Sequence, residues 1–189
     1  MSENRGIFSL EEFYDLQVSG ETTNIFQVFR YVNVAISSAP AFGYLAGGKS
    51  SSGDRSSVDR IDYGNDTATA APKGTLVSSQ DGGNIAGTGN QSFGYTCGTS
   101  ITNVNRIDYS SDTSTSVRKG TLSSARAYIS AVGNRNFGYW CGGNLSRSSF
   151  IDRIDYSNDT AASTPKGPLS RSILASAATG TVSYTHLTL

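Results

Sequence analysis

Hydrophobic and polar positions alternate with a period of two in several short segments of this chain. In the segment FIDRIDY, Ile154 and Tyr156 fall on one face of an extended backbone, and Arg153 and Asp155 fall on the other. The preceding segment NFGYWCGG alternates in the same way and ends at a glycine pair, which is typical of a strand that leads into a tight turn. This pattern predicts short, half-buried β-strands rather than helices.

The pattern recurs three times in a fixed order. The string RIDY starts at residues 60, 106 and 153, and FGY starts at residues 42, 93 and 137. Each RIDY is followed by an Asp-Thr turn signal and then by KGTL or KGPL, so each copy predicts a unit of four strands. We interpret the repeated RIDY residues as structural: Arg60, Asp62, Tyr63, Arg106, Asp108, Tyr109, Arg153, Asp155 and Tyr156. Within each copy, the aspartate is expected to pair with the arginine two residues earlier on the same strand face.

These segments resemble the kelch repeat of β-propellers. Phe137 to Gly143 matches the aromatic strand that ends in a glycine pair, Asp152 to Tyr156 the next strand, and Pro165 to Arg171 the proline-containing link. The sequence departs from the kelch pattern where a tryptophan is usual, because the nearest positions hold Ala70, Ser116 and Ser163. The repeated tyrosines are therefore expected to pack the blades against one another.

The resemblance implies an all-β fold, an incomplete kelch-like β-propeller with three four-stranded blades, the start of a fourth, and a short N-terminal helix. We expect a leader over residues 1–24, with a capping box at Ser9 to Glu12 that opens the helix, and repeats over 25–180. The expected blades cover residues 31–73, 78–120 and 124–167, with a stub at 171–180. Residues 181–189 include SYTHLTL, which resembles translated sequencing-adaptor sequence, so we expect a non-native tail and a longer natural protein.

Charge and composition argue against several classes of partner. The 15 basic and 15 acidic residues cancel, so no broad positive field favours nucleic acid. No apolar run reaches the length of about 18 residues that would favour membrane insertion, and the first residues lack the plan of a signal peptide. Cys97 and Cys141 occupy the same slot of neighbouring copies, which favours packed thiols without a disulfide.

The sequence offers no convincing catalytic, cofactor or metal site. His186 is the sole histidine and lies in the expected tail, whereas kelch-fold oxidases hold copper with histidines and tyrosines. The glycine-rich segment DGGNIAGTGN lacks the lysine and the helix of a phosphate loop, and we interpret it as a loop between blades. We therefore expect a protein that is not an enzyme and needs no cofactor.

Variable loops between each glycine pair and RIDY, at residues 49–57, 99–104 and 144–149, are the best candidates for binding, because loops on a rigid scaffold often carry function. Their Ser, Asn, Arg and Lys content suits hydrogen bonds to polar ligands such as glycans, although ordinary solvated loops have the same composition. The candidate binding residues are Lys49, Asp54, Arg55, Thr99, Asn103, Asn144 and Arg147.

The sequence motifs of the repeats, together with the short leader, resemble those of structural proteins of marine tailed phages. This resemblance implies a virion location after assembly in the host cytoplasm, with other virion proteins or host-surface polysaccharide as partners. The leader would then dock to the particle or cap the propeller edge. One alternative is a bacterial carbohydrate-binding or adhesin propeller, secreted or on the cell surface. A second alternative is a fragment of a galactose-oxidase-like enzyme.

Overall fold

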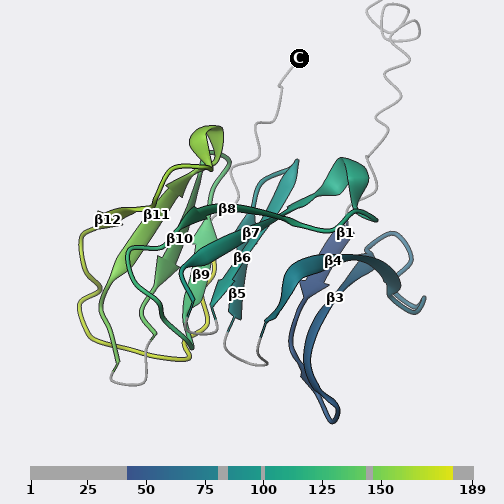
Figure 1. The fold of residues 1–189 in the computed structure, drawn as a ribbon, viewed down its shortest axis with the longest axis horizontal. Helices are drawn as coiled ribbons and strands as arrows, with labels where there is room; N and C mark the ends of the chain where they lie inside the picture. Colours follow the sequence, from purple (N-terminus) through teal and green to yellow (C-terminus); the bar gives the residue numbers. More distant parts are fainter. Residues whose placement is uncertain (1–41, 81–84, 99–100, 144–146, 181–189) are drawn as a thin grey trace, which may run out of the picture. The chain divides into compact units, whose positions relative to one another are not determined.

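A computed structural model of the chain describes residues 42–80, 85–98, 101–143 and 147–180. These residues are all β, with three four-stranded antiparallel sheets and two single-turn 3-10 helices (Figure 1). The leader, its expected helix and the expected tail at 181–189 lie outside the described residues. Within the described ranges, no helix is long and apolar enough to cross a lipid bilayer.

The three sheets follow one another along the chain, as the repeats predicted. Sheet 1 comprises β1 (Phe42–Ala46), β2 (Lys49–Ser50), β3 (Gly53–Asp62) and β4 (Ala71–Gln80). Sheet 2 comprises β5 (Ile85–Gly89), β6 (Phe93–Gly98), β7 (Asn103–Asp108) and β8 (Val117–Thr121). Sheet 3 comprises β9 (Ser130–Gly133), β10 (Phe137–Cys141), β11 (Ile151–Asp155) and β12 (Thr164–Lys166). Sheets 2 and 3 are meanders in sequence order, whereas in sheet 1 the long strand β3 pairs with β1, β2 and β4.

The three copies share one strand register. The first aromatic residue of FGY lies opposite the aspartate of RIDY in each sheet, for example Phe93 opposite Asp108, so the tyrosine Tyr95 lies opposite Arg106. The same register holds between β1 and β3 and between β10 and β11. Because side chains alternate along a strand, this register places each FGY tyrosine and its RIDY arginine on the same face of the sheet.

Short turns after RIDY are fixed by the aspartate that ends the strand. Asp108 caps the 3-10 turn Tyr109–Ser111, where its side chain accepts a hydrogen bond from the Ser110 N–H at 2.9 Å. Asp155 caps the turn Tyr156–Asn158 in the same way. The turn therefore forms because the sequence supplies an acceptor just where the strand ends.

The core is continuous between sheets 2 and 3. Trp140 is fully buried and belongs to a cluster with Tyr95, Val104 and Ile154. Ile154 on β11 and Tyr156 directly after it are buried, and Arg153 is partly exposed, which confirms the predicted alternation. The sequence did not indicate the packing of β9 and β10 against β5.

The glycine-rich segment is not a loop throughout. Residues 85–89 form the strand β5, which pairs with β6 from Ile85 opposite Gly98 to Gly89 opposite Gly94. Small residues suit this strand because Gly89 runs close to the backbone of Phe93, where a Cβ would collide. The interpretation of this stretch as a loop is therefore wrong for residues 85–89.

The expected fourth copy begins as an extended segment along sheet 3. Ile173 forms an isolated bridge with Ser148, and Ala175 donates from its N–H to the Tyr128 carbonyl at 2.9 Å. Ala175 and Tyr128 both have left-handed backbones, with φ of 50° and 55°, at corresponding points of their copies. Ala175 thus repeats the backbone conformation of Tyr128, which precedes β9.

Candidate functional site

A buried aspartate joins sheet 3 to sheet 2. Asp159, directly after the 3-10 turn Tyr156–Asn158, accepts from the Arg106 guanidinium at 2.8 Å and from the Lys119 ammonium at 3.3 Å. The Tyr95 hydroxyl donates to the same carboxylate at 2.9 Å. A single carboxylate thus satisfies three donors of the preceding sheet, and we call this set an aspartate joint.

The same joint occurs between sheets 1 and 2. Asp112 accepts from Arg60 at 2.8 Å, from Lys73 at 3.3 Å and from the Tyr44 hydroxyl at 3.0 Å. Burial opposes ionisation of Asp112, but hydrogen bonds from Tyr44 and Lys73 and the nearby positive charges outweigh it, so the Asp112 pKa lies below its usual range. Burial also raises the pKa of Tyr44, whose hydroxyl therefore remains a donor near neutral pH.

The expected ion pairs within each copy are wrong. Arg60 pairs with Asp112 instead of Asp62. Arg106 pairs with Asp159 instead of Asp108, so each arginine pairs with the aspartate in the turn after RIDY of the next copy. Asp62 instead accepts from the Gly64 N–H at 2.8 Å. Side-chain and backbone hydrogen bonds from Ser110 lower the pKa of Asp108, and those from Ser157 lower that of Asp155. The RIDY aspartates are therefore turn caps.

Stacked tyrosines accompany each joint. The rings of Tyr44 and Tyr109 lie 4.5 Å apart at 14°, and those of Tyr95 and Tyr156 lie 4.7 Å apart at 9°. Each pair joins an FGY tyrosine to the RIDY tyrosine of the next copy. The prediction that repeated tyrosines replace the missing tryptophan in packing is therefore confirmed.

A second buried ion pair ties the segment between β8 and β9 to sheet 3. Arg126, between β8 and β9, pairs with Asp152 on β11, and both side chains are 1% exposed. Asp152 also accepts from the hydroxyls of Ser123 and Ser163, each at 3.0 Å. The sequence analysis missed this pair, although the charge of Asp152 inside an otherwise hydrophobic strand face was a usable signal.

The two cysteines behave as packed thiols. Both Cys97 and Cys141 are free, as expected, and Cys97 is fully buried. Burial raises the pKa of the Cys97 thiol to about 12, which leaves it protonated and unreactive near neutral pH.

The candidate binding residues form a site only in part. Lys49, Asp54 and Arg55 come together on the β2–β3 hairpin, where the Lys49 ammonium lies 3.8 Å from the Asp54 carboxylate. Asn103 begins β7 and Arg147 is exposed with a left-handed backbone, φ 61°. The other two candidates, Thr99 and Asn144, lie outside the described residues. The segment expected to be a loop at 49–57 is instead a hairpin, which extends from sheet 1 in Figure 1.

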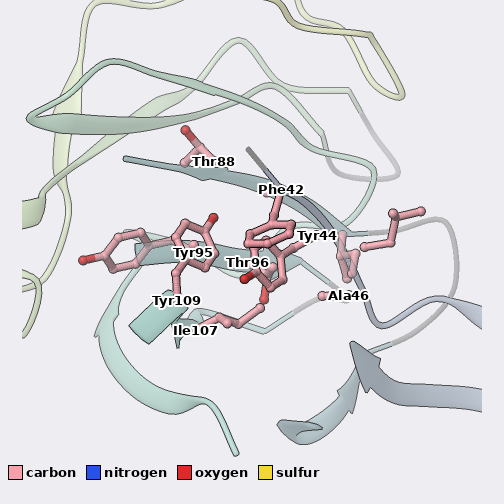
Figure 2. A pocket seen from close by; sticks show the side chains of 12 residues that line it. Phe42, Tyr44, Ala46, Thr88, Tyr95, Thr96, Ile107 and Tyr109 are labelled. Atoms are coloured by element: carbon pink, nitrogen blue, oxygen red, sulfur yellow. The ribbon is translucent and has the colours of Figure 1, made fainter. Parts of the chain in front are cut away.

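An aromatic groove of about 510 Å³ lies between sheets 1 and 2. Figure 2 shows Phe42, Tyr44, Tyr95 and Tyr109 around it. In sheets 2 and 3, the matching edge of the FGY strand pairs with β5 and β9, but β1 has no such partner among the described residues. The groove thus lies beside the edge of β1 that has no partner among the described residues, and we assign no ligand to it.

Comparison with known proteins does not add an identity. No protein-family model matches the chain, and no curated protein matches it significantly. Within the described residues, no group of three or more His, Cys, Asp or Glu side chains is placed to hold a metal ion.

Proposed function

We propose that this chain is a non-enzymatic structural protein of a phage particle, with a kelch-like propeller that contacts host-surface polysaccharide or a neighbouring subunit. The resemblance of its repeats to structural proteins of tailed phages supports the particle location. The three four-stranded sheets are consistent with blades. On this account the protein assembles in the host cytoplasm and its leader docks to the particle or caps the propeller.

The observation that carries the proposal is that the repeated ionisable side chains bind one another between sheets. Asp112 and Asp159 bind the arginine, lysine and tyrosine of the preceding sheet, so these groups hold the scaffold together. A catalytic acid or base needs access to a substrate, and these carboxylates are largely buried against three donors. A rigid scaffold that displays polar surface groups favours binding over chemistry.

The β2–β3 hairpin is the displayed surface that we assign to binding. Its exposed residues Lys49, Asp54 and Arg55 supply both donors and acceptors for sugar hydroxyls. The Arg55 Nε donates to the Ser50 hydroxyl at 2.8 Å, which holds the guanidinium in place before a ligand arrives. Such an ordered side chain loses less conformational freedom on binding.

Mass spectrometry of purified phage particles tests the particle location directly. We expect peptides from residues 42–180 at a constant ratio to the major capsid protein across density-gradient fractions. Absence of these peptides from particles that retain their other minor proteins would contradict the proposal.

Binding to purified host polysaccharide tests the hairpin. The variant K49A/R55A should weaken binding at least about tenfold, because two donors are lost. Arg118→Ala, an exposed change on β8 far from the hairpin in sequence, is the matched control and should bind as the parent does. Equal loss in both variants would show that the hairpin does not carry recognition.

A further inference from the structure

A polar cleft of about 450 Å³ lies between sheets 2 and 3. Asn90 reaches it from the turn between β5 and β6, and Arg135 and Asn136 reach it from the turn between β9 and β10. Asp155, the last residue of β11, and Ser157 in the following 3-10 turn line it as well. We call this space the turn cleft. Its volume lies within the range of about 300–1,000 Å³ that is typical of small-molecule sites.

The turn cleft belongs to a contact between two sheets that both lie in the described chain. Its lining residues fall between positions 90 and 157, in sheets 2 and 3 and the turns that join their strands. The joint at Asp159 and the packing of β5 on β9 hold these sheets together. The described ranges break off before Ile85 and after Gly98, at the opposite end of the strands. A repeat added after sheet 3 would pack on the other face of that sheet.

Two asparagine turns set the shape of the cleft. The Asn90 side-chain oxygen accepts hydrogen bonds from the N–H groups of Ser92 and Phe93, at 2.9 and 3.0 Å. Asn134 binds the same two positions of its own turn, at 2.9 Å each. The Asn90 amide also donates to the Arg135 carbonyl at 3.4 Å, which ties one turn to the other. The backbone around the cleft is therefore ordered before a ligand arrives.

Asp155 presents an available acceptor to the cleft. One oxygen of its carboxylate accepts from the Ser157 N–H at 2.9 Å and from the Ser157 hydroxyl at 2.7 Å. These bonds lower the pKa of Asp155, so the carboxylate is ionised near neutral pH. Among the described residues, its other oxygen accepts no hydrogen bond and the side chain forms no ion pair. A ligand hydroxyl can therefore donate to this oxygen without displacing a protein group.

The turn between β9 and β10 presents donors to the same cleft. The side chains of Arg135 and Asn136 are exposed, and neither forms a hydrogen bond or an ion pair among the described residues. The lining thus holds one positive and one negative side chain, Arg135 and Asp155. Such a balance favours a neutral ligand rich in hydroxyl groups, because a hydroxyl both donates to a carboxylate and accepts from a guanidinium.

The repeats separate a constant frame from variable residues at this end of the sheets. Copies 2 and 3 share an asparagine, a phenylalanine, an aspartate and a serine, at 90, 93, 108 and 110 and at 134, 137, 155 and 157. Between the asparagine and the phenylalanine, copy 2 has Gln91 and Ser92, whereas copy 3 has Arg135 and Asn136. The frame forms the turns through its own side chains, but the residues between take part only with their backbone. Exposed residues that differ on a constant frame are typical of a binding loop.

We infer that the turn cleft binds a neutral saccharide. The free oxygen of Asp155 accepts a hydrogen bond from a sugar hydroxyl, and Arg135 and Asn136 donate to sugar oxygens. The Phe137 ring, which also lines the cleft, supplies apolar surface for the C–H groups of the sugar. This site lies on sheets 2 and 3, so it is separate from the β2–β3 hairpin of sheet 1 and does not depend on what the hairpin binds.

A glycan array probed with the full chain tests the inference. The array carries neutral and acidic oligosaccharides of defined structure, and we expect the chain to bind neutral ones. Arg135→Ala and Asp155→Asn should each weaken that binding at least about tenfold, because each removes a hydrogen bond to a charged group. Asparagine at 155 keeps an acceptor for the Ser157 cap, so the turn should persist. Titration of the isotope-labelled chain with the bound glycan should shift the side-chain amide signals of Asn90 and Asn136.

Two control variants match these changes. Arg118→Ala removes an exposed arginine from β8 outside the cleft, and Gln91→Ala truncates the residue of copy 2 that corresponds to Arg135. Both should bind glycans as the parent does, and the midpoint of urea unfolding should show that every variant remains folded.

Three results would overturn the inference. They are no binding to any neutral glycan, binding to acidic glycans alone, and unchanged binding in both Arg135→Ala and Asp155→Asn. The hairpin is judged by its own variant, K49A/R55A, with host polysaccharide, so the two proposals can fail separately.

Discussion

Arg106 on β7 donates a hydrogen bond at 2.8 Å to Asp159, which lies 53 residues later in the turn of the next copy. The same relation joins Arg60 to Asp112, 52 residues apart. Because each copy is 46 or 47 residues long, these bonds run from one copy to the next and join neighbouring sheets. The repeat therefore encodes its own interface as well as its strands.

Removing the carboxylate of an aspartate joint should destabilise the protein. Asp159→Ala leaves Arg106, Lys119 and Tyr95 without their shared acceptor, so we expect a loss of about 3 kcal/mol in the free energy of unfolding. Urea denaturation at low protein concentration measures it. Asp66→Ala removes the corresponding exposed aspartate and should change that free energy by less than about 0.5 kcal/mol. Equal losses of unfolding free energy in the two variants would contradict the claim that Asp159 has buried partners and Asp66 is exposed.

A methyl group added at Gly120 should destabilise the protein, whereas one added at Gly167 should not. Gly120→Ala forces a Cβ into the Ala161 carbonyl and should cost about 1–3 kcal/mol of stability. Gly167→Ala meets nothing within 4 Å and should be close to neutral in the monomer. Thermal unfolding of both variants checks this, and a Gly120→Ala protein as stable as the parent would argue against close contact between sheets 2 and 3.

Acid should weaken the joint between sheets 1 and 2. The pKa of Asp112 in the folded protein lies below the value of about 3.9 expected in the unfolded chain, so its contribution is fully present above that value. The contribution is lost as pH falls through the folded pKa. The difference in unfolding free energy between the parent and Asp112→Asn should therefore narrow between about pH 5 and pH 2. A difference that stays constant or widens would contradict this ionisation state.

The buried Arg126–Asp152 pair should be costly to break from one side. Arg126→Met leaves the Asp152 carboxylate buried without its main partner, and we expect a loss of about 3–5 kcal/mol. Arg118→Met removes an exposed arginine from β8 and serves as the control. Guanidinium chloride unfolding compares the two, and a small loss for Arg126→Met would mean that the pair is solvated in solution.

The sequence predicted the repeated elements well because their signals are local. Alternation in FIDRIDY places Ile154 inside, and a turn follows each RIDY as the sequence predicted. The aspartate that caps this turn is the last acid of RIDY, for example Asp108, whereas the following Asp112 bonds the preceding sheet. The partner of Arg106 was predicted wrongly, because Asp108 is close in sequence and Asp159 is close only after the sheets pack. Spacing within one copy carries no information about the contact between copies.

The candidate binding residues show the same limit. Polar composition marked residues 49–57 as a displayed segment, but it did not distinguish a loop from the β2–β3 hairpin. The pairing of Arg126 with Asp152 escaped prediction because the first precedes β9 and the second lies on β11, and only the meander brings them together.

The central claim is that the repeats are joined from one copy to the next, and a double-mutant cycle in urea tests it most directly. Arg106→Met and Asp159→Asn, alone and together, should give a coupling energy of about 1–3 kcal/mol. The matched cycle with Asp108→Asn should give less than about 0.5 kcal/mol, because Asp108 caps its own turn. Strong coupling of Arg106 to Asp108 with none to Asp159 would contradict the account.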